Sequence, residues 1–185
     1  MNERIKILGI SGSLRKGSYN SALLRAAKEL TPADAEIEIL DIGDLPLFNQ
    51  DYETKLPALV VAFKEKVALA DAILFVSPEY NYSYSGVIKN AIDWGTRPWG
   101  QNSFAGKPAA VVGASGGMLG TARMQYHLRQ VLQGAGMNTL LQPEIFVANA
   151  QTKFDENGNL TDEETKKAVV SLLTAFIEWT RKIKG

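Results

Sequence analysis

Residues 4–30 read RIKILGISGSLRKGSYNSALLRAAKEL, and this stretch decides the fold. Its first part, residues 4–10, alternates charged and apolar side chains and then becomes wholly apolar, which predicts a strand that enters the core of a sheet. From Asn20 onward apolar residues recur at helical spacing, so a helix follows. The connecting loop, residues 11–20, therefore lies where a strand ends and a helix begins.

This loop contains no acidic residue and is rich in groups that bind anions. Hydroxyls, flexible glycines, a guanidinium and free amides at a helix N-terminus are what a dianionic phosphate needs. The groups in question belong to Ser11, Gly12, Ser13, Arg15, Lys16, Gly17, Ser18 and Asn20. The competing interpretation is a turn that only caps the helix, through Ser18 or Asn20. Capping needs only one such residue, so the presence of several hydroxyls together with Arg15 favours a phosphate site.

The residues that the loop lacks narrow the kind of phosphate ligand. No Gly-Lys-Ser/Thr tripeptide follows Gly12, which excludes a loop that binds a triphosphate with its magnesium. A dinucleotide fingerprint places its third glycine near position 15, where Arg15 stands instead. A guanidinium is suited to a terminal monophosphate. Asp41 resembles the ribose-binding acid of an NAD site, but it lies far past the loop and is interpreted as a loop-packing aspartate.

Length and composition exclude several classes of protein. A chain of 185 residues predicts one domain, residues 1–185, and buries roughly 70% of its unfolded surface. Lysine plus arginine equals aspartate plus glutamate, 20 each, so we expect neither nucleic acid nor membrane as a partner. No apolar window of about 18 residues would span a membrane, and the N-terminus has no signal-peptide pattern. Cysteine is absent. We expect a cytoplasmic protein by default.

Strand and helix patterns alternate along the whole chain. Apolar runs typical of buried strands occupy residues 5–10, 37–42, 72–76, 108–113 and, weakly, 139–147. Helical patterns occupy residues 21–30, 56–70, 86–94, 121–135 and 162–183. Five βα units predict an α/β fold with a parallel sheet and helices on both of its faces.

Two further loops are expected beside the first, because ligands of open α/β sheets bind beyond the carboxyl ends of the strands. After the third strand the chain reads SPEYNYSYSGVIKNAIDW, residues 77–94, with an amide at Asn81 and three tyrosines nearby. After the fourth strand comes ASGGMLGTAR, residues 114–123, whose glycines allow close backbone approach. An amide, backbone groups and aromatic faces suit a planar heterocycle. Tyrosines that merely pack against Trp94 and Trp99 are the alternative.

A phosphate at one end and a flat polar ring at the other describe a flavin mononucleotide. On GISGSLRKGSYNSALL, LPLFNQD, SPEYNYSYSGVIKNAIDW and ARMQYHLRQVL the chain resembles the NAD(P)H-dependent FMN reductases, a flavodoxin-like family of quinone, chromate and azo-dye reducing enzymes. The resemblance implies a three-layer sandwich whose five-stranded parallel sheet has the order 2-1-3-4-5. It also implies FMN as cofactor, NADPH or NADH as co-substrate, and a small-molecule electron acceptor.

The resemblance also assigns residues to the cofactor. It implies phosphate contacts from Ser11, Ser13, Arg15, Ser18, Asn20 and Ser21. It implies ring contacts from Pro78, Glu79, Tyr80, Asn81 and Tyr82, then from Ser115, Gly116 and Gly117. No acid–base dyad or nucleophile is visible, and none is needed, because a flavin carries hydride chemistry itself.

A rival function and two candidate metal sites remain to be weighed. A flavodoxin-type electron carrier without turnover is the rival function, but Arg15 and the zero net charge favour a reductase. The Asp155-x-Asn157-x-Asn159 pattern lacks the glycine and glutamate of a calcium loop, and we expect no metal there or at His127. This segment is interpreted as an exposed turn, followed by a capping box that runs from Thr161 to Glu164.

We also expect a homodimer or homotetramer with the flavin near a subunit boundary. A small flavin needs only part of the aromatic surface near the proposed ring, and such side chains are enriched at interfaces. The residues concerned are Tyr82, Tyr84, Trp94 and Trp99. The family resemblance points the same way.

Overall fold

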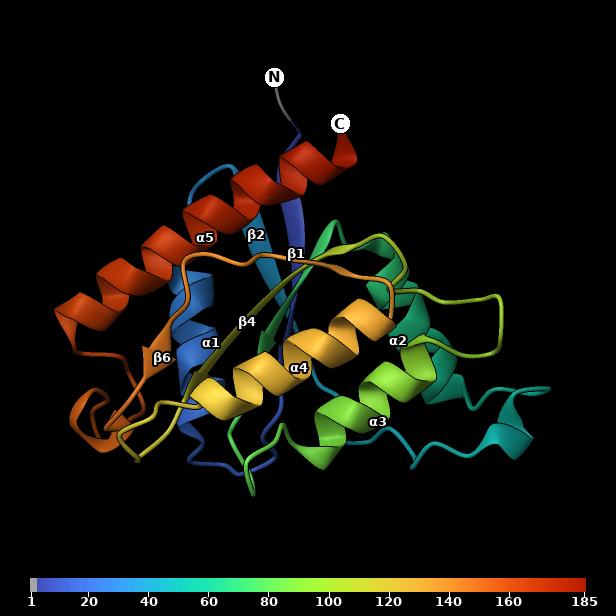
Figure 1. Ribbon diagram of the computed structural model, residues 1–185, viewed down its shortest axis with the longest axis horizontal. Coiled ribbons are helices and arrows are strands. Elements are labelled where there is room, and N and C mark those ends of the chain that lie inside the picture. Colours follow the sequence, from blue (N-terminus) through green and yellow to red (C-terminus); the bar gives the residue numbers. More distant parts are fainter. Residues whose placement is uncertain (1–2) are drawn as a thin grey trace.

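A parallel sheet between two layers of helices forms the core, as the alternating pattern predicts (Figure 1). The computed structural model describes residues 3–185. Neighbouring strands follow the order β2-β1-β3-β4-β5, and β6 also pairs with β4. The strands are β1 (Ile5–Ser11), β2 (Ala35–Leu40), β3 (Ala72–Val76), β4 (Pro108–Ala114), β5 (Asn138–Thr139) and β6 (Phe146–Val147). The expected fold class and strand order are confirmed.

Each face of the sheet is covered by its own set of helices, with its own apolar cluster. The helices are α1 (Tyr19–Glu29), α2 (Ala58–Leu69), α3 (Gly86–Gly95), α4 (Ala122–Gly134) and α5 (Glu163–Lys184). Leu23 of α1 and Phe176 of α5 are fully buried in the cluster on one face. Phe63 of α2, Trp94 of α3 and Leu128 of α4 belong to the cluster on the other. Two short 3-10 turns, η1 (Gln50–Tyr52) and η2 (Ala150–Thr152), complete the elements.

The fifth strand position differs from the single run expected over residues 139–147. It is filled by two short strands that pair with opposite ends of β4, β5 with Pro108 and Ala109 and β6 with Gly113 and Ala114. Pro143 lies between them and has no N–H to offer a ladder. Two carbonyl groups of this segment accept hydrogen bonds from side chains of α4 instead of from a neighbouring strand. Gln125 Nε2 donates to the Ile145 carbonyl at 2.8 Å, and Arg129 donates to that of Leu140.

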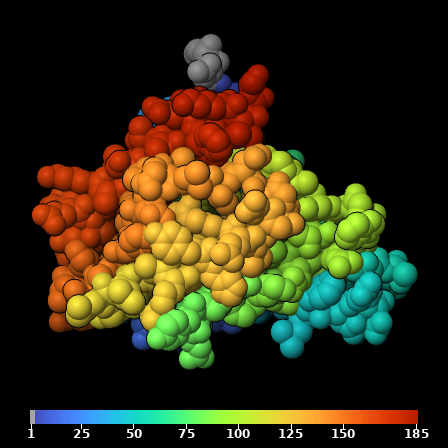
Figure 2. All heavy atoms as spheres, in the orientation of Figure 1, coloured from blue at the N-terminus to red at the C-terminus, as the bar shows by residue number. Residues whose placement is uncertain are grey.

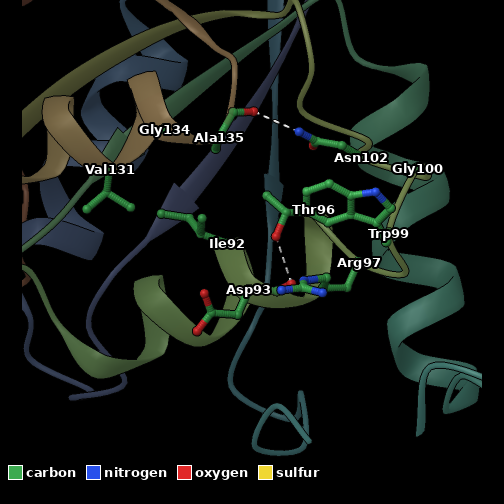
Figure 3. A pocket seen from close by; sticks show the side chains of 10 residues that line it. All are labelled: Ile92, Asp93, Thr96, Arg97, Trp99, Gly100, Asn102, Val131, Gly134 and Ala135. Atoms are coloured by element: carbon green, nitrogen blue, oxygen red, sulfur yellow. Dashed lines mark hydrogen bonds between the residues drawn. The ribbon is translucent and has the colours of Figure 1, made fainter. Parts of the chain in front are cut away.

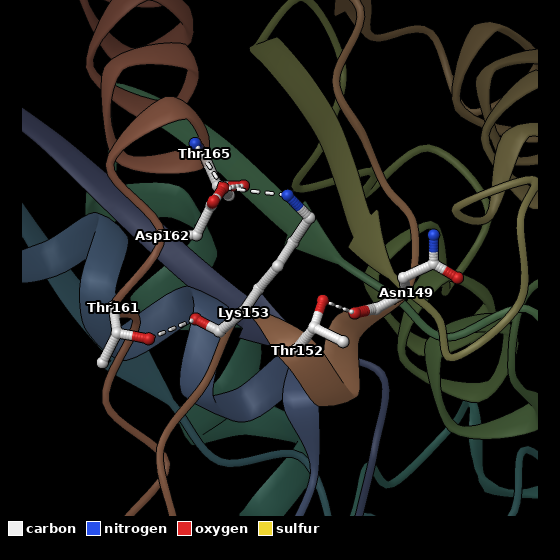
Figure 4. A network of polar contacts seen from close by, with 6 residues as sticks. All are labelled: Asn149, Thr152, Lys153, Thr161, Asp162 and Thr165. Carbon is white, nitrogen blue, oxygen red and sulfur yellow. Dashed lines mark hydrogen bonds and ion pairs between the residues drawn. The ribbon is translucent and has the colours of Figure 1, made fainter.

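Helix α5 begins one residue later than the expected capping box. Asp162, not Thr161, is the N-cap, and its carboxylate accepts a 2.9 Å hydrogen bond from the Thr165 N–H. Lys153 Nζ lies 2.8 Å from the same carboxylate, and the resulting network is drawn in Figure 4. The capping box is wrong because a carboxylate that caps the helix and also pairs with a lysine outcompetes a neutral hydroxyl.

Trp94 is fully buried, so its expected place in a subunit interface is wrong. Its indole N–H donates to the Pro46 carbonyl at 2.7 Å, and its ring meets Phe48 edge-on at 5.0 Å. This contact anchors the segment after β2, which projects from the body of the molecule near residues 45–55 (Figure 2). Among the described residues, no helix is both long enough and apolar enough to cross a membrane.

Candidate flavin site

Three loops meet where β1, β3 and β4 end, at the lower edge of the molecule in Figure 1. Between them lies a pocket with a volume of about 340 Å³. Its lining comes from all three loops: Ser13, Arg15, Ser18, Tyr19, Asn20, Pro78, Glu79, Tyr80, Ala114, Ser115 and Gly116. The parallel sheet brings these segments together because it places every strand's carboxyl end at one edge.

The first loop is stabilised by hydrogen bonds of its own hydroxyl groups. Ser18 is the N-cap of α1, and its Oγ accepts from the N–H groups of Asn20 and Ser21 at 3.2 and 3.3 Å. Ser11 Oγ and Ser21 Oγ lie 2.8 Å apart. Arg15 is exposed and donates to the Gly17 carbonyl, so its guanidinium stays beside the loop. Capping by Ser18 therefore coexists with a loop that presents cationic and hydroxyl groups.

Asn20 joins the first loop to the third. Its amide donates to the Ala114 carbonyl at 3.0 Å and accepts from the Ala114 N–H at 2.8 Å, and the residue is buried. Both hydrogen-bonding ends of the side chain are therefore engaged within the protein. Asn20 fixes the distance between the two loops, a role that its predicted contact with phosphate did not anticipate.

The second loop ends in a tight turn that presents two side chains to solvent. Tyr80 and Ser83 exchange backbone hydrogen bonds of 2.9 and 3.0 Å, while Asn81 and Tyr82 have positive φ angles of 49° and 70°. Two left-handed central residues are the mark of the tightest hairpin turns. Ser83 Oγ lies 3.0 Å from His127 Nδ1, which ties the turn to α4. The turn thus holds an amide and an aromatic ring beyond the mouth of the pocket.

Glu79 is the carboxylate that lines the pocket, and groups at the start of α4 neutralise its charge. It accepts hydrogen bonds from the Met124 N–H at 3.1 Å and from the Arg123 guanidinium, at the N-terminus of α4. The same guanidinium stacks on the Tyr82 ring at 3.8 Å from its centre. An unpaired carboxylate would repel an anionic ligand, whereas this one is neutralised and locks the loop to α4.

The third loop is backed by the segment around η2. The Ala150 N–H donates to the Ser115 carbonyl at 3.0 Å, and the Ser115 N–H donates to the Val147 carbonyl at 2.9 Å. A Cβ on Gly116 would meet only the end of the exposed Gln151 side chain, at 3.2 Å. The exposed backbone at Gly116 is therefore open to close approach by a flat group.

The structure divides the predicted site residues into three groups. The pocket collects Ser13, Arg15, Ser18, Asn20, Pro78, Glu79, Tyr80, Ser115 and Gly116. Ser11 and Ser21 line a neighbouring pocket of about 570 Å³ on the β2 side of the loop, while Asn81, Tyr82 and Gly117 line neither. The sequence interpretation missed Tyr19 and Ala114. The position of Tyr19 between two predicted phosphate contacts, Ser18 and Asn20, is the signal in the sequence that could have marked it.

The weaker candidates have structural explanations. Asp41 accepts a hydrogen bond from the Gly43 N–H at 2.8 Å, as expected of a loop-packing aspartate. Asp155 likewise folds its own turn, accepting from the N–H groups of Asn157 and Asn159 at 2.9 and 2.8 Å. Within residues 3–185 no three or more His, Cys, Asp or Glu side chains cluster in a way that would hold a metal ion.

A separate hollow lies between the C-terminal ends of α3 and α4, with a volume of about 550 Å³ (Figure 3). Trp99 lines it with 86% of the residue exposed, and the Arg97 guanidinium lies 5.7 Å from the centre of its ring. This hollow shares no lining residue with the pocket at the strand ends.

The pocket at the strand ends suits FMN in charge, size and shape. Its volume lies within the usual range of small-ligand sites, roughly 300 to 1,000 Å³. Its lining combines Arg15 and serine hydroxyls from the first loop with Tyr80 from the second and the exposed backbone of Gly116 from the third. The paired Glu79 leaves no uncompensated negative charge in the lining. An elongated ligand with a phosphate at one end and a flat ring at the other fits this arrangement.

Comparison with known proteins identifies the family. Residues 5–152 match the NADPH-dependent FMN reductase family, and the chain belongs to it. The chain is 49% identical over 186 residues to an NAD(P)H-dependent FMN reductase of Pseudomonas aeruginosa, covering 100% of both chains. It is 42% identical over 177 residues to a 2-hydroxy-1,4-benzoquinone reductase of a Burkholderia species, covering 96% of this chain and 97% of the relative.

A solved structure extends the similarity to three dimensions. The flavoenzyme NAD(P)H:(acceptor) oxidoreductase FerB of Paracoccus denitrificans matches with a TM-score of 0.90 at 40% identity, covering 96% of this chain and 98% of that one. The chain is accordingly an NAD(P)H-dependent oxidoreductase that uses FMN and acts on small molecules.

Proposed function

We propose that the pocket between the three loops holds FMN, with its phosphate at the first loop and its ring at the second and third. The observation that carries this proposal is the continuous pocket from Arg15 to Gly116. The proposed phosphate contacts are Ser11, Ser13, Arg15, Ser18 and Ser21, together with the backbone at Asn20. The proposed ring contacts are Pro78, Glu79, Tyr80, Asn81, Tyr82, Ser115, Gly116 and Gly117.

A bound FMN would supply the hydride chemistry between NAD(P)H and the acceptor, and we propose that the two substrates react in turn, in a ping-pong cycle. The chain's own residues would position the cofactor and its substrates and would stabilise charge on the flavin ring. The backbone at Gly116 offers its N–H to negative charge on the polar edge of the ring. Tyr82 is 70% exposed at the tip of its turn and presents a flat face to arriving substrates.

Quinones and oxidised free flavins are the acceptors that we propose first, with azo dyes and chromate as further candidates. Names of relatives support the first two classes, because they include a 2-hydroxy-1,4-benzoquinone reductase and an FMN reductase. Steady-state turnover against a quinone, FMN, an azo dye and chromate, each with NADH and NADPH, tests this order. Parallel lines in double-reciprocal plots support the ping-pong cycle, and intersecting lines contradict it.

Purified protein is expected to be yellow and to release FMN rather than FAD. The Arg15→Ala variant should bind FMN more weakly by roughly 1.5 to 3 kcal/mol, the value of a hydrogen bond to a charged group. Lys28→Ala is the matched control, since it removes an exposed cation near the end of α1 that lines neither the strand-end pocket nor its neighbour. Tight FAD binding, or an unchanged FMN affinity in Arg15→Ala, contradicts the proposal.

We further propose a homodimer, or a tetramer built from dimers, with the flavin near the subunit boundary. Exposed aromatic side chains support it: Tyr82 on the turn that follows Tyr80, and Trp99 in the hollow of Figure 3. Large aromatic surfaces in water are costly and mark association sites. We propose a cytoplasmic location as well, because NAD(P)H is supplied inside the cell, and cell fractionation tests it.

A further inference from the structure

The turn between η2 and α5 packs beside the phosphate loop, although it is more than a hundred residues away in the sequence. Phe154 and Leu160 pair across this turn, and the Asp155 N–H donates to the Asn159 carbonyl at 3.0 Å. The turn covers the start of α1, where Phe154 meets Tyr19. The family match covers residues 5–152, so it includes Tyr19 and ends two residues before Phe154.

Two ring contacts connect the turn to the guanidinium of the phosphate loop. The rings of Phe154 and Tyr19 lie 5.6 Å apart between centres and are inclined by 31°. On the Tyr19 ring, 5.7 Å from its centre, lies the guanidinium of Arg15. Tyr19 and Arg15 both line the strand-end pocket, whereas Phe154 does not. The contacts therefore run from a buried residue outside the pocket to an exposed cation within it.

Phe154 is rigidly held, in contrast with Arg15. Only 8% of Phe154 is exposed. Its neighbour Lys153 is fixed twice, because its Nζ pairs with Asp162 at 2.8 Å and its carbonyl accepts from the Thr161 hydroxyl at 3.2 Å (Figure 4). Arg15 is exposed, and its guanidinium donates to the Gly17 carbonyl and lies on the Tyr19 ring. A long exposed side chain loses much conformational freedom when it binds a ligand.

We propose that Phe154 is a positioning residue for the phosphate loop: it fixes the Tyr19 ring, and that ring holds the Arg15 guanidinium in place to receive the phosphate of FMN. This inference rests on the proposed placement of the phosphate at Arg15. A guanidinium that is already held on an aromatic face loses less freedom on binding. The turn therefore raises affinity for the phosphate end of the cofactor without touching it.

Comparison of FMN with riboflavin tests the proposal, because riboflavin lacks only the phosphate. The full-length protein is stripped of flavin, and both affinities are measured by quenching of flavin fluorescence. Tyr19→Leu and Phe154→Leu keep apolar bulk but remove a ring, whereas Tyr19→Phe keeps the ring. Phe63→Leu is the matched control, because it breaks an aromatic pair with Phe104, 6.3 Å between centres, on the other face of the sheet. Thermal unfolding shows that each variant is folded.

We expect Tyr19→Leu and Phe154→Leu to weaken FMN binding by about threefold to tenfold and to leave riboflavin binding within about a factor of two. Tyr19→Phe and Phe63→Leu should keep the wild-type ratio of the two affinities. An equal loss for both flavins, or an unchanged ratio in Phe154→Leu, overturns the inference. Arg15→Ala separates the two proposals. If Arg15→Ala lowers the ratio of FMN affinity to riboflavin affinity while Phe154→Leu does not, only the positioning role of Phe154 is contradicted. If Arg15→Ala leaves that ratio unchanged, the proposed phosphate site itself is contradicted.

Discussion

The side chain of Asn20 holds both backbone groups of Ala114, through hydrogen bonds of 3.0 and 2.8 Å. One amide thus spans the first loop and the end of β4, across 94 positions of sequence. Both residues are buried, so neither hydrogen bond is exchanged with water in the folded state. The relationship sets the width of the proposed flavin pocket, because the third loop starts at the next residue, Ser115.

The first prediction concerns this contact. Asn20→Ala leaves the N–H and C=O of Ala114 without partners, so we expect a loss of about 1 to 3 kcal/mol in the free energy of unfolding, together with weaker FMN binding. Asn102→Ala is the matched control. Its amide also joins two backbone groups, the Ala135 carbonyl at 2.8 Å and the Phe104 N–H at 2.9 Å, away from the strand-end pocket. Urea denaturation and flavin titration of both variants measure the two effects.

The control should lose stability and keep its affinity for FMN. Equal flavin affinity in Asn20→Ala and wild type would show that the third loop keeps its place without the amide. That result would contradict the bridging role.

The second prediction concerns the third loop. Gly116→Val should lose flavin while the fold stays intact, because the added Cβ would meet only the flexible end of Gln151, at 3.2 Å. The branched side chain would instead occupy the space that we assign to the ring. Absorbance at the flavin band measures occupancy, and circular dichroism measures the fold. Gly134→Val, at the end of α4, is the control, since a Cβ there meets nothing within 4 Å and the residue does not line the strand-end pocket. A fully loaded Gly116→Val protein would place the ring elsewhere.

Much of this architecture is predictable from the sequence because it follows from local pattern. Alternating strands and helices define a parallel sheet, and a parallel sheet brings the loops after β1, β3 and β4 to one edge. The break between β5 and β6 is not predictable in this way. It depends on Gln125 and Arg129, which supply hydrogen bonds to carbonyls of a segment that comes later in the chain.

In the candidate site, too, the sequence predicts local features but not contacts between distant residues. Serine hydroxyls and Arg15 signal an anion site by composition alone. Burial of Trp94 and the bridge from Asn20 depend on partners that lie tens of residues away, Pro46 and Ala114. A sequence pattern does not reveal which distant carbonyl satisfies a polar side chain. The structure therefore corrects the interpretation of Trp94 as an interface residue, and it adds to Asn20 a bridging role that the sequence does not reveal.

The third prediction concerns pH. Hydrogen bonds from Lys153 and Thr165 lower the pKa of Asp162 from 3.8 to about 2. A depressed pKa in the folded state means that the carboxylate stabilises the fold above pH 3.8, and that this contribution is lost as the pH falls toward 2. The difference in unfolding free energy between wild type and Asp162→Asn should thus be constant from about pH 7 to 5 and shrink below about pH 4.

Urea denaturation across this range measures the difference. Glu163→Gln serves as control, because its carboxylate is 72% exposed and pairs only with Lys166 on the surface of α5. Exposed pairs of this kind contribute little to stability. A difference between wild type and Asp162→Asn that grows as the pH falls would contradict the assigned sign.

The last prediction concerns association. Trp99 is 86% exposed, and its ring is held by Arg97 over a hollow of about 550 Å³ between α3 and α4 (Figure 3). An exposed indole beside a guanidinium is suited to become the anchor of an interface, because tryptophan and arginine dominate binding energy at such sites. Trp99→Ser should therefore weaken self-association by about 2 kcal/mol or more, roughly thirtyfold in the dissociation constant. Light scattering during size exclusion at micromolar concentration measures the mass of the assembly.

Leu69→Ser on α2 is the control for this prediction. It removes another apolar side chain, 76% exposed and outside the hollow, and should leave the mass unchanged. A wild-type protein that runs as a monomer with flavin bound and full turnover contradicts the proposed interface, because the exposed indole would then have no partner to stabilise.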